Sequence, residues 1–355
     1  MPLPLIVPVL IGAAGLFGVG KGIKAAVDNS EADELNTRAR NDVSQWNRQL
    51  DHSREATNKS LETVGREKAR ALLETLPDFL DTFGKLKNVE PIDGSIDGLT
   101  LGSFGQAQVA DMRRSCSLME ASAIGLGTGA TGGALAAFGA YSSTMMLASA
   151  GTGTAISALS GAAATNATLA WLGGGTLASG GLGIAGGTMV LGALAAGPAL
   201  LVFGTFLGMK ASANLSNARS NIELAKTHVE EIRNVLVRLE AIYDLATISS
   251  NALQAAIDSC ASLTAQVKHL IEYDGVDYRS YSASAKSTVM KAVKSAQLLK
   301  LLVDASILNE TGAVSDEGGA AIRSIAKHLN VGTEVETEAV LPLPSAMPAT
   351  PVPMI

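Results

Sequence analysis

The organisation of the chain is decided by residues 121–209, which read ASAIGLGTGATGGALAAFGAYSSTMMLASAGTGTAISALSGAAATNATLAWLGGGTLASGGLGIAGGTMVLGALAAGPALLVFGTFLGM. These 89 consecutive residues contain no Asp, Glu, Lys, Arg or His, and they hold 21 of the 37 glycines. A domain that folds in water normally exposes charged side chains. Charge-free stretches of this length are typical of membrane spans or of helices fully covered by protein. We therefore predict that residues 121–209 form a Gly/Ala-rich insert that enters a membrane.

The insert divides into two outer segments, residues 121–150 and 181–209, around a middle at 151–175. As a helix, each outer segment would be roughly 45 Å long, enough to cross a hydrocarbon core of about 30 Å with tilt. Strongly apolar side chains are few in the first segment and more frequent in the second, so we expect a hairpin whose insertion is conditional. Pro198 is expected to kink the second segment, and Trp171 gives the middle an interfacial character.

Glycines at four-residue spacing indicate close packing of helices within the insert. On a helix, such glycines form a smooth ridge that another backbone can approach closely. We predict this role for three sets: Gly125, Gly129 and Gly133; Gly183 and Gly187; and Gly204 and Gly208.

A heptad pattern follows the insert almost without interruption from residue 222 to residue 271. It predicts one long coiled-coil-like helix that continues from the insert and ends near Gly275. Charged residues such as Glu230 and Arg238 lie off the apolar positions. The coiled-coil seam consists of Ile222, Val229, Leu236, Tyr243, Ser250, Ile257, Thr264 and Ile271, with Ala225, Ile232, Leu239, Ala246, Leu253, Cys260 and Val267 as the companion row.

The remaining segments complete an all-α organisation, in which long amphipathic helices form an antiparallel bundle that carries the hydrophobic hairpin. Residues 1–24 form a hydrophobic N-terminal segment; because Lys21 and Lys24 follow its apolar run, it is interpreted as retained and not as a cleaved signal. Residues 25–120 form a charged helical arm with an interruption at Pro77. The predicted ranges after the insert are 210–275 for the coiled-coil helix, 276–310 for a C-terminal helix and 311–355 for a flexible Pro-rich tail.

Motifs that suggest chemistry are incomplete. The stretch GLFGVGKG at 15–22 resembles a phosphate-binding loop but has Gly22 where Ser or Thr should bind magnesium. Two G-x-G-x-x-G matches lie in the insert, which supplies no acid for a dinucleotide ribose. The four histidines are scattered, without metal-ligand spacing. We therefore predict no enzyme activity, no cofactor and no metal.

The net charge and the two cysteines limit which partners and which cellular compartment suit the chain. A net charge of −6 without a basic, aromatic-interleaved stripe argues against nucleic-acid binding. Cys116 and Cys260 lie far apart in sequence and suit a reducing compartment as two apolar thiols, with a disulfide between them as the less favoured reading.

The block at residues 151–200, GTGTAISALSGAAATNATLAWLGGGTLASGGLGIAGGTMVLGALAAGPAL, resembles a recurrent segment of a bacterial family. Members of that family carry a hydrophobic N-terminus, a charged helix, this glycine-rich insert and another charged helix, and the resemblance covers about residues 1–310. In architecture the chain is also similar to α-helical pore-forming toxins and to apolipoprotein L proteins, which carry a hydrophobic hairpin within a helical bundle. The resemblance implies an all-α fold and contact with a lipid bilayer.

Three hypotheses for function follow. The first is a membrane-inserting effector that permeabilises the bacterial inner membrane, in defence against phage or competitors, as a homo-oligomer. The second is a constitutive membrane scaffold whose coiled coil recruits a protein partner such as a membrane-remodelling GTPase. The third is a bundle that stays in water with the insert as its core. Since Arg113, Arg114 and Lys210 flank the insert, both arms are expected in the cytoplasm.

Overall fold

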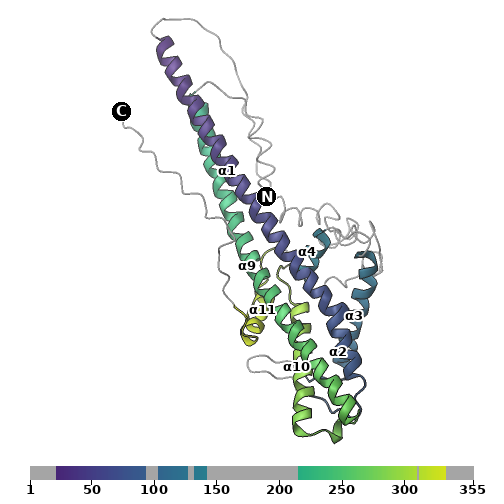
Figure 1. The fold of residues 1–355 in the computed structure, drawn as a ribbon. Helices are drawn as coiled ribbons and strands as arrows, with labels where there is room; N and C mark the ends of the chain where they lie inside the picture. Colours follow the sequence, from purple (N-terminus) through teal and green to yellow (C-terminus); the bar gives the residue numbers. More distant parts are fainter. Residues whose placement is uncertain (1–20, 93–102, 127–131, 142–214, 310–311, 333–355) are drawn as a thin grey trace. The chain divides into compact units, whose positions relative to one another are not determined.

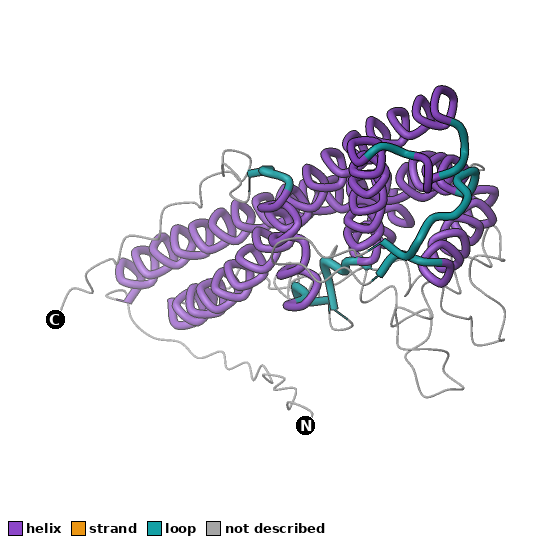
Figure 2. Tube along the Cα trace, turned by 90° about the horizontal axis from the view of Figure 1, so that it is seen from below, coloured by secondary structure: helices purple, strands orange, loops and turns teal. Residues whose placement is uncertain are grey.

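The protein is described by a computed structural model that defines residues 21–92, 103–126, 132–141, 215–309 and 312–332. Helical residues make up 84% of this part, and it contains no strand, only three isolated bridges (Figure 2). The predicted all-α class is therefore confirmed for these residues. The chain divides into two compact units, which α1 (Lys21–Arg70) and α9 (Leu215–Asp274) both enter.

The smaller unit contains residues 21–46 of α1 and 215–230 of α9 among those described. Here the two helices lie side by side (Figure 1), around a small apolar cluster of Ala39, Val43 and Ala225. Asn221 donates a hydrogen bond from Nδ2 to Oδ1 of Asn36 at 2.8 Å. Small side chains at these contacts allow the two backbones to approach closely.

The larger unit has a continuous apolar core to which every described helix contributes. Its elements are residues 47–70 of α1, a π-helical turn η1 (Ala71–Thr75), α2 (Leu76–Phe83), α3 (Gln106–Leu126), α4 (Gly132–Ala140), residues 231–274 of α9, η4 (Tyr278–Ser280), α10 (Ala283–Asp304) and α11 (Asp316–His328). Helix α3 runs across the predicted boundary between the charged arm at 25–120 and the insert at 121–209 and ends at Leu126.

Pro77 does not break the first arm as predicted. Residues 71–75 form a π-helical turn in which the Leu76 amide bonds to the Ala71 carbonyl, and α2 begins directly afterwards. Pro77 lies in the first turn of α2 and cannot donate a backbone hydrogen bond to the preceding turn, which has π-helical geometry. The chain therefore stays helical from Lys21 to Phe83.

The helices that follow α9 have well-defined starts. Ser282 accepts a hydrogen bond from the Ala285 amide at 3.2 Å and caps α10, and Ser315 caps α11 in the same way through Gly318 at 3.1 Å. The C-terminal helix predicted within residues 276–310 is observed as α10, which is shorter and runs from Ala283 to Asp304. The prediction of a flexible tail over 311–355 is wrong for residues 316–328, because these form α11 and bury Ile322 and Ile325.

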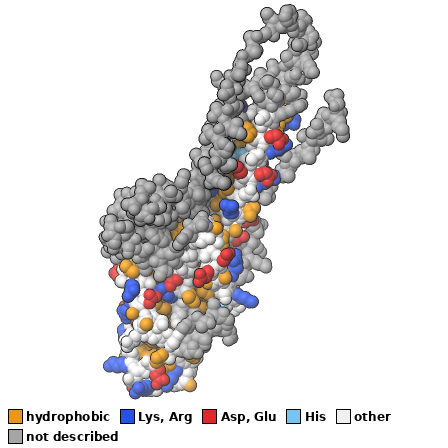
Figure 3. Space-filling view, turned by 180° about the vertical axis from the view of Figure 1, so that it is seen from behind, with side chains coloured by type: hydrophobic (Ala, Val, Ile, Leu, Met, Phe, Trp, Pro, Cys, Tyr) orange, Lys and Arg blue, Asp and Glu red, His pale blue; other side chains and the backbone are white. Residues whose placement is uncertain are grey.

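The surface of the described helices carries charges of both signs. Figure 3 shows acidic and basic side chains intermixed over the visible face. Many form pairs within one helix, such as Arg66 with Glu62 at 2.6 Å. On this face, the described side chains therefore show no large field of one sign.

Candidate functional site

The candidate site is the place where α4, the first helix inside the charge-free insert, docks on α1. The two helices cross at Gly65 and Gly139. A Cβ atom on Gly65 would lie 2.0 Å from the Leu135 carbonyl oxygen, and one on Gly139 would lie 1.9 Å from the Leu61 carbonyl oxygen. Real Cβ atoms essentially never come so close. The backbones of α1 and α4 are therefore in direct contact, and the crossing admits only glycine at these two positions.

One turn after Gly65, the Lys68 side chain is completely buried beside the end of α4. Its Nζ atom donates hydrogen bonds to the carbonyl oxygens of Tyr141 at 3.0 Å and of Ala305 at 2.8 Å. These carbonyls follow the last residues of α4 and α10, where helices leave backbone acceptors without intrahelical partners. Lys68 thus caps two helix C-termini at once, a place where the helix dipoles favour a cation.

A second set of hydrogen bonds fixes the same end of α4. The backbone amides of Ile307 and Leu308 both donate to the carbonyl oxygen of Ala140, at 2.8 and 2.9 Å. The side chains of Phe138 and Tyr141 are buried in the core alongside. The start of the insert is therefore attached to the bundle through backbone contacts with two separate segments.

Lys68 is unusual in this site because its side chain is buried and its pKa is shifted. Burial lowers the pKa of its ammonium group to about 7, and the nearby carboxylate of Asp304 opposes that shift. Asp304 itself pairs with Lys300 on α10, and Nζ of Lys300 lies 3.4 Å from a carboxylate oxygen of Asp111 on α3. A network of charges thus links α1, α3 and α10 next to the α4 docking site.

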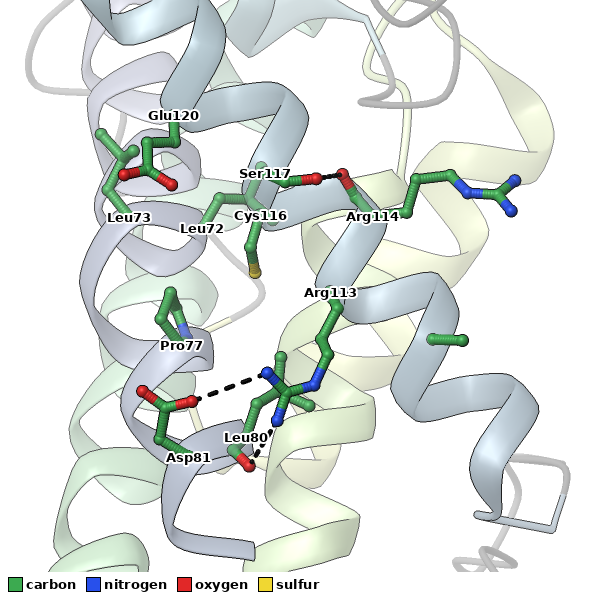
Figure 4. Close-up of a pocket in the computed structure, with 11 residues that line it drawn as sticks. Leu72, Leu73, Pro77, Leu80, Asp81, Arg113, Arg114, Cys116, Ser117 and Glu120 are labelled. Carbon is green, nitrogen blue, oxygen red and sulfur yellow. Dashed lines mark hydrogen bonds and ion pairs between the residues drawn. The ribbon is translucent and has the colours of Figure 1, made fainter. Parts of the chain in front are cut away.

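A groove of about 660 Å³ lies between η1, α2 and α3 (Figure 4). Arg113 crosses it from α3, donating to the Leu80 carbonyl at 3.2 Å and lying 3.6 Å from a carboxylate oxygen of Asp81. Burial raises the pKa of the Cys116 thiol to about 11, so it stays protonated. The groove is thus held by an internal ion pair and contains no activated nucleophile, which makes it the weaker candidate.

The residues predicted for the insert lie mostly outside the described residues: Gly129, Trp171, Gly183, Gly187, Pro198, Gly204 and Gly208. Gly125 lies in α3 and Gly133 in α4. The glycines at the observed crossing, Gly65 and Gly139, were not predicted, nor was Lys68. Lys68 continues the apolar stripe of Leu61 and Val64, and a lysine in such a stripe is the signal that could have marked it.

The coiled-coil seam lies inward on α9. Nine positions of the seam and its companion row are buried in the larger unit: Ile232, Leu236, Leu239, Ala246, Leu253, Ile257, Cys260, Thr264 and Val267. Ile222 and Val229 pack against the apolar cluster of the smaller unit. The long helix itself is confirmed, because α9 runs without a break from Leu215 to Asp274.

Among the described residues there is no group of three or more metal-binding side chains, and both cysteines are free and buried. None of the helices defined in the structure has both the length and the apolar character to cross a bilayer. Comparison of the chain with protein-family models, with curated proteins and with solved structures gives no match.

Proposed function

We propose that this chain is a membrane-inserting helical protein whose bundle holds the start of the charge-free insert, while the rest of the insert enters the bacterial inner membrane and permeabilises it. The observation that carries this proposal is the composition of residues 142–209. These 68 residues follow the docked α4 and contain no side chain that carries a charge at neutral pH. Their polar side chains are those of Ser, Thr and Asn, which are uncharged. Lipid is the solvent that such a stretch fits best.

The two outer segments differ in a way that supports conditional insertion. Residues 181–209 carry eleven strongly apolar side chains, which together favour insertion by about 3 to 7 kcal/mol. In the weaker first segment, Phe138 and Tyr141 are buried in the core of the bundle and Leu135 is partly buried at the α1 crossing. Membrane entry of the first segment therefore requires α4 to leave its site on α1.

Release of a dye from lipid vesicles tests the proposal. The purified protein is expected to release a self-quenched dye from vesicles containing anionic lipid. Leu201→Arg should strongly reduce release, because an arginine at the centre of a span costs about 2.5 to 3.5 kcal/mol. Val237→Arg places the same charge at a position on α9 that is 62% exposed and serves as the matched control.

The outcome separates this proposal from its alternatives. Intact vesicles, together with no growth defect on overexpression, would contradict permeabilisation. If the protein stays in the membrane pellet after alkaline carbonate but causes no leakage, the scaffold hypothesis is favoured. Recovery of all protein in the supernatant without detergent favours a bundle that keeps its insert as a core.

A further inference from the structure

We propose that Lys68 makes the docking of α4 pH-dependent, so that α4 is held more tightly on α1 and α10 at pH 8 than at pH 6. The proposal concerns regulation of the site described above, and its consequence for membrane entry rests on the proposed function. It is argued from the geometry around Nζ, the charges nearby and the proton balance of docking.

The hydrogen-bond geometry favours the neutral amine. Among the described residues Nζ has two acceptors, the carbonyl oxygens of Tyr141 and Ala305. A neutral amine has two N–H donors and matches these acceptors, whereas an ammonium group has three. Protonation of Lys68 in the docked state therefore adds a charge and a donor inside a site with 0% solvent exposure, where both are unfavourable.

The surrounding elements offer little compensation for that charge. Helix α4 contains no charged residue, and neither do residues 305–308. On α10, Asp304 is the carboxylate that acts on Lys68, but Lys300 already pairs with it, and Lys300 is shared with Asp111 of α3. On α9, Thr247 lies 3.5 Å from Ser60 and Gln254 accepts a hydrogen bond from Arg70 at 3.4 Å, and in the part of the chain that the structure describes Asp304 is the one carboxylate that shifts the pKa of Lys68. The helix dipoles of α4 and α10 and the Asp304 carboxylate favour the cation, but burial outweighs them, so the net environment disfavours it.

The direction of the pH effect follows from the proton balance. When α4 leaves, Nζ loses its enclosure, and its pKa is expected to return toward the ordinary value of 10.5, against about 7 when docked. Between these two values the undocked state holds one more proton than the docked state, so docking strengthens as pH rises and weakens as pH falls toward 7. From pH 6 to pH 8 the docking constant should increase about tenfold. Below pH 6 both states are protonated, and the dependence ends.

Hydrogen exchange of the full-length protein tests this inference. Protection factors of the α4 amides, corrected for intrinsic exchange, should be about tenfold higher at pH 8 than at pH 6 in the wild type. Lys68→Met should abolish this difference. Lys59→Met removes an exposed lysine from the same helix and should leave the tenfold difference intact. Equal protection of wild-type α4 at the two pH values, or loss of the difference in Lys59→Met, would overturn the inference.

A second measurement covers the case in which Lys68→Met does not fold. In wild-type protein labelled with ¹³C at lysine Cε, one lysine resonance should titrate near pH 7; titration of all lysines near 10.5 would overturn the inference. Vesicle leakage at both pH values distinguishes the two proposals. If the protection of α4 depends on pH but no dye leaks, the role of Lys68 is supported and the membrane function is contradicted. If dye leaks but the protection of α4 does not depend on pH, the membrane function is supported and the role of Lys68 is contradicted.

Discussion

Gly139→Ala should detach α4 from the bundle, because the added Cβ atom would lie 1.9 Å from the Leu61 carbonyl oxygen. Ordinary contact begins at 3.4 Å, so the two helices must separate by about 1.5 Å. A shift of that size would stretch the 3.0 Å bond from Lys68 to the Tyr141 carbonyl beyond hydrogen-bonding range. The substitution therefore affects the crossing and the lysine cap together.

The expected loss is about 1 to 5 kcal/mol of docking free energy. Overpacking contributes about 1 to 3 kcal/mol and an unsatisfied buried polar group about 1 to 3, against a gain of up to about 1 from alanine's higher helix propensity. The lower limit corresponds to a roughly fivefold loss of docking.

Hydrogen exchange of α4, with urea unfolding as a second readout, measures this loss. Gly105→Ala is the matched control, because its Cβ would meet nothing closer than Oε1 of Gln108 at 3.7 Å. It should stay within about 0.5 kcal/mol of the wild type. Wild-type protection of α4 in Gly139→Ala would refute the reasoning, since it would mean that the two backbones are not in contact.

Three further predictions concern other parts of the larger unit. Gly318→Ala should cost about 1 to 3 kcal/mol and expose α11 to hydrogen exchange, because the Cβ atom would lie 1.9 Å from the Ser306 carbonyl oxygen; unchanged α11 protection would contradict this. Ser282→Ala removes the cap of α10 and should lower the urea-derived stability by about 1 kcal/mol, and an unchanged midpoint would argue against the cap. Cys116 and Cys260, whose pKa values burial raises to about 11 and about 12, should react with a thiol-specific disulfide reagent at pH 8 only after unfolding; rapid reaction of the native protein would show that they are accessible thiolates.

The long helices were predictable from the sequence because their apolar residues recur at helical spacing. The heptad pattern over 222–271 predicts α9, and it marks buried positions such as Leu239 and Leu253, although it does not mark Leu245, which is also buried. Periodicity of this kind shows which face of a helix is buried, so the helix can be predicted without knowing which segment packs against it.

The tail shows a signal that was present but overlooked. Ser315 precedes Asp316 and Glu317, and the segment ends with Lys327 and His328, which is the charge order of a capped helix. The prediction of a flexible tail from residue 311 rests on the proline-rich composition of residues 341–355. Composition describes a segment as a whole and does not show where it begins.

The docking site of α4 could not be predicted from one sequence. Gly65 and Gly139 meet across 74 positions, and a glycine pair at that separation has no local pattern. The four-residue spacing predicts that Gly125, Gly129 and Gly133 form a packing surface on a helix. It does not show which other helix packs against that surface. Lys68 was the readable clue, since a lysine on an apolar stripe must find acceptors when it is buried.

The central claim, that residues beyond α4 enter lipid, is tested most directly through Trp171. The chain has two tryptophans, so Trp46→Phe leaves Trp171 as the single reporter. In vesicles with brominated acyl chains, its emission should shift to shorter wavelength and be quenched relative to vesicles of unbrominated lipid. If the variant binds vesicles as the wild type does and its emission is the same with brominated and unbrominated lipid, the account is contradicted.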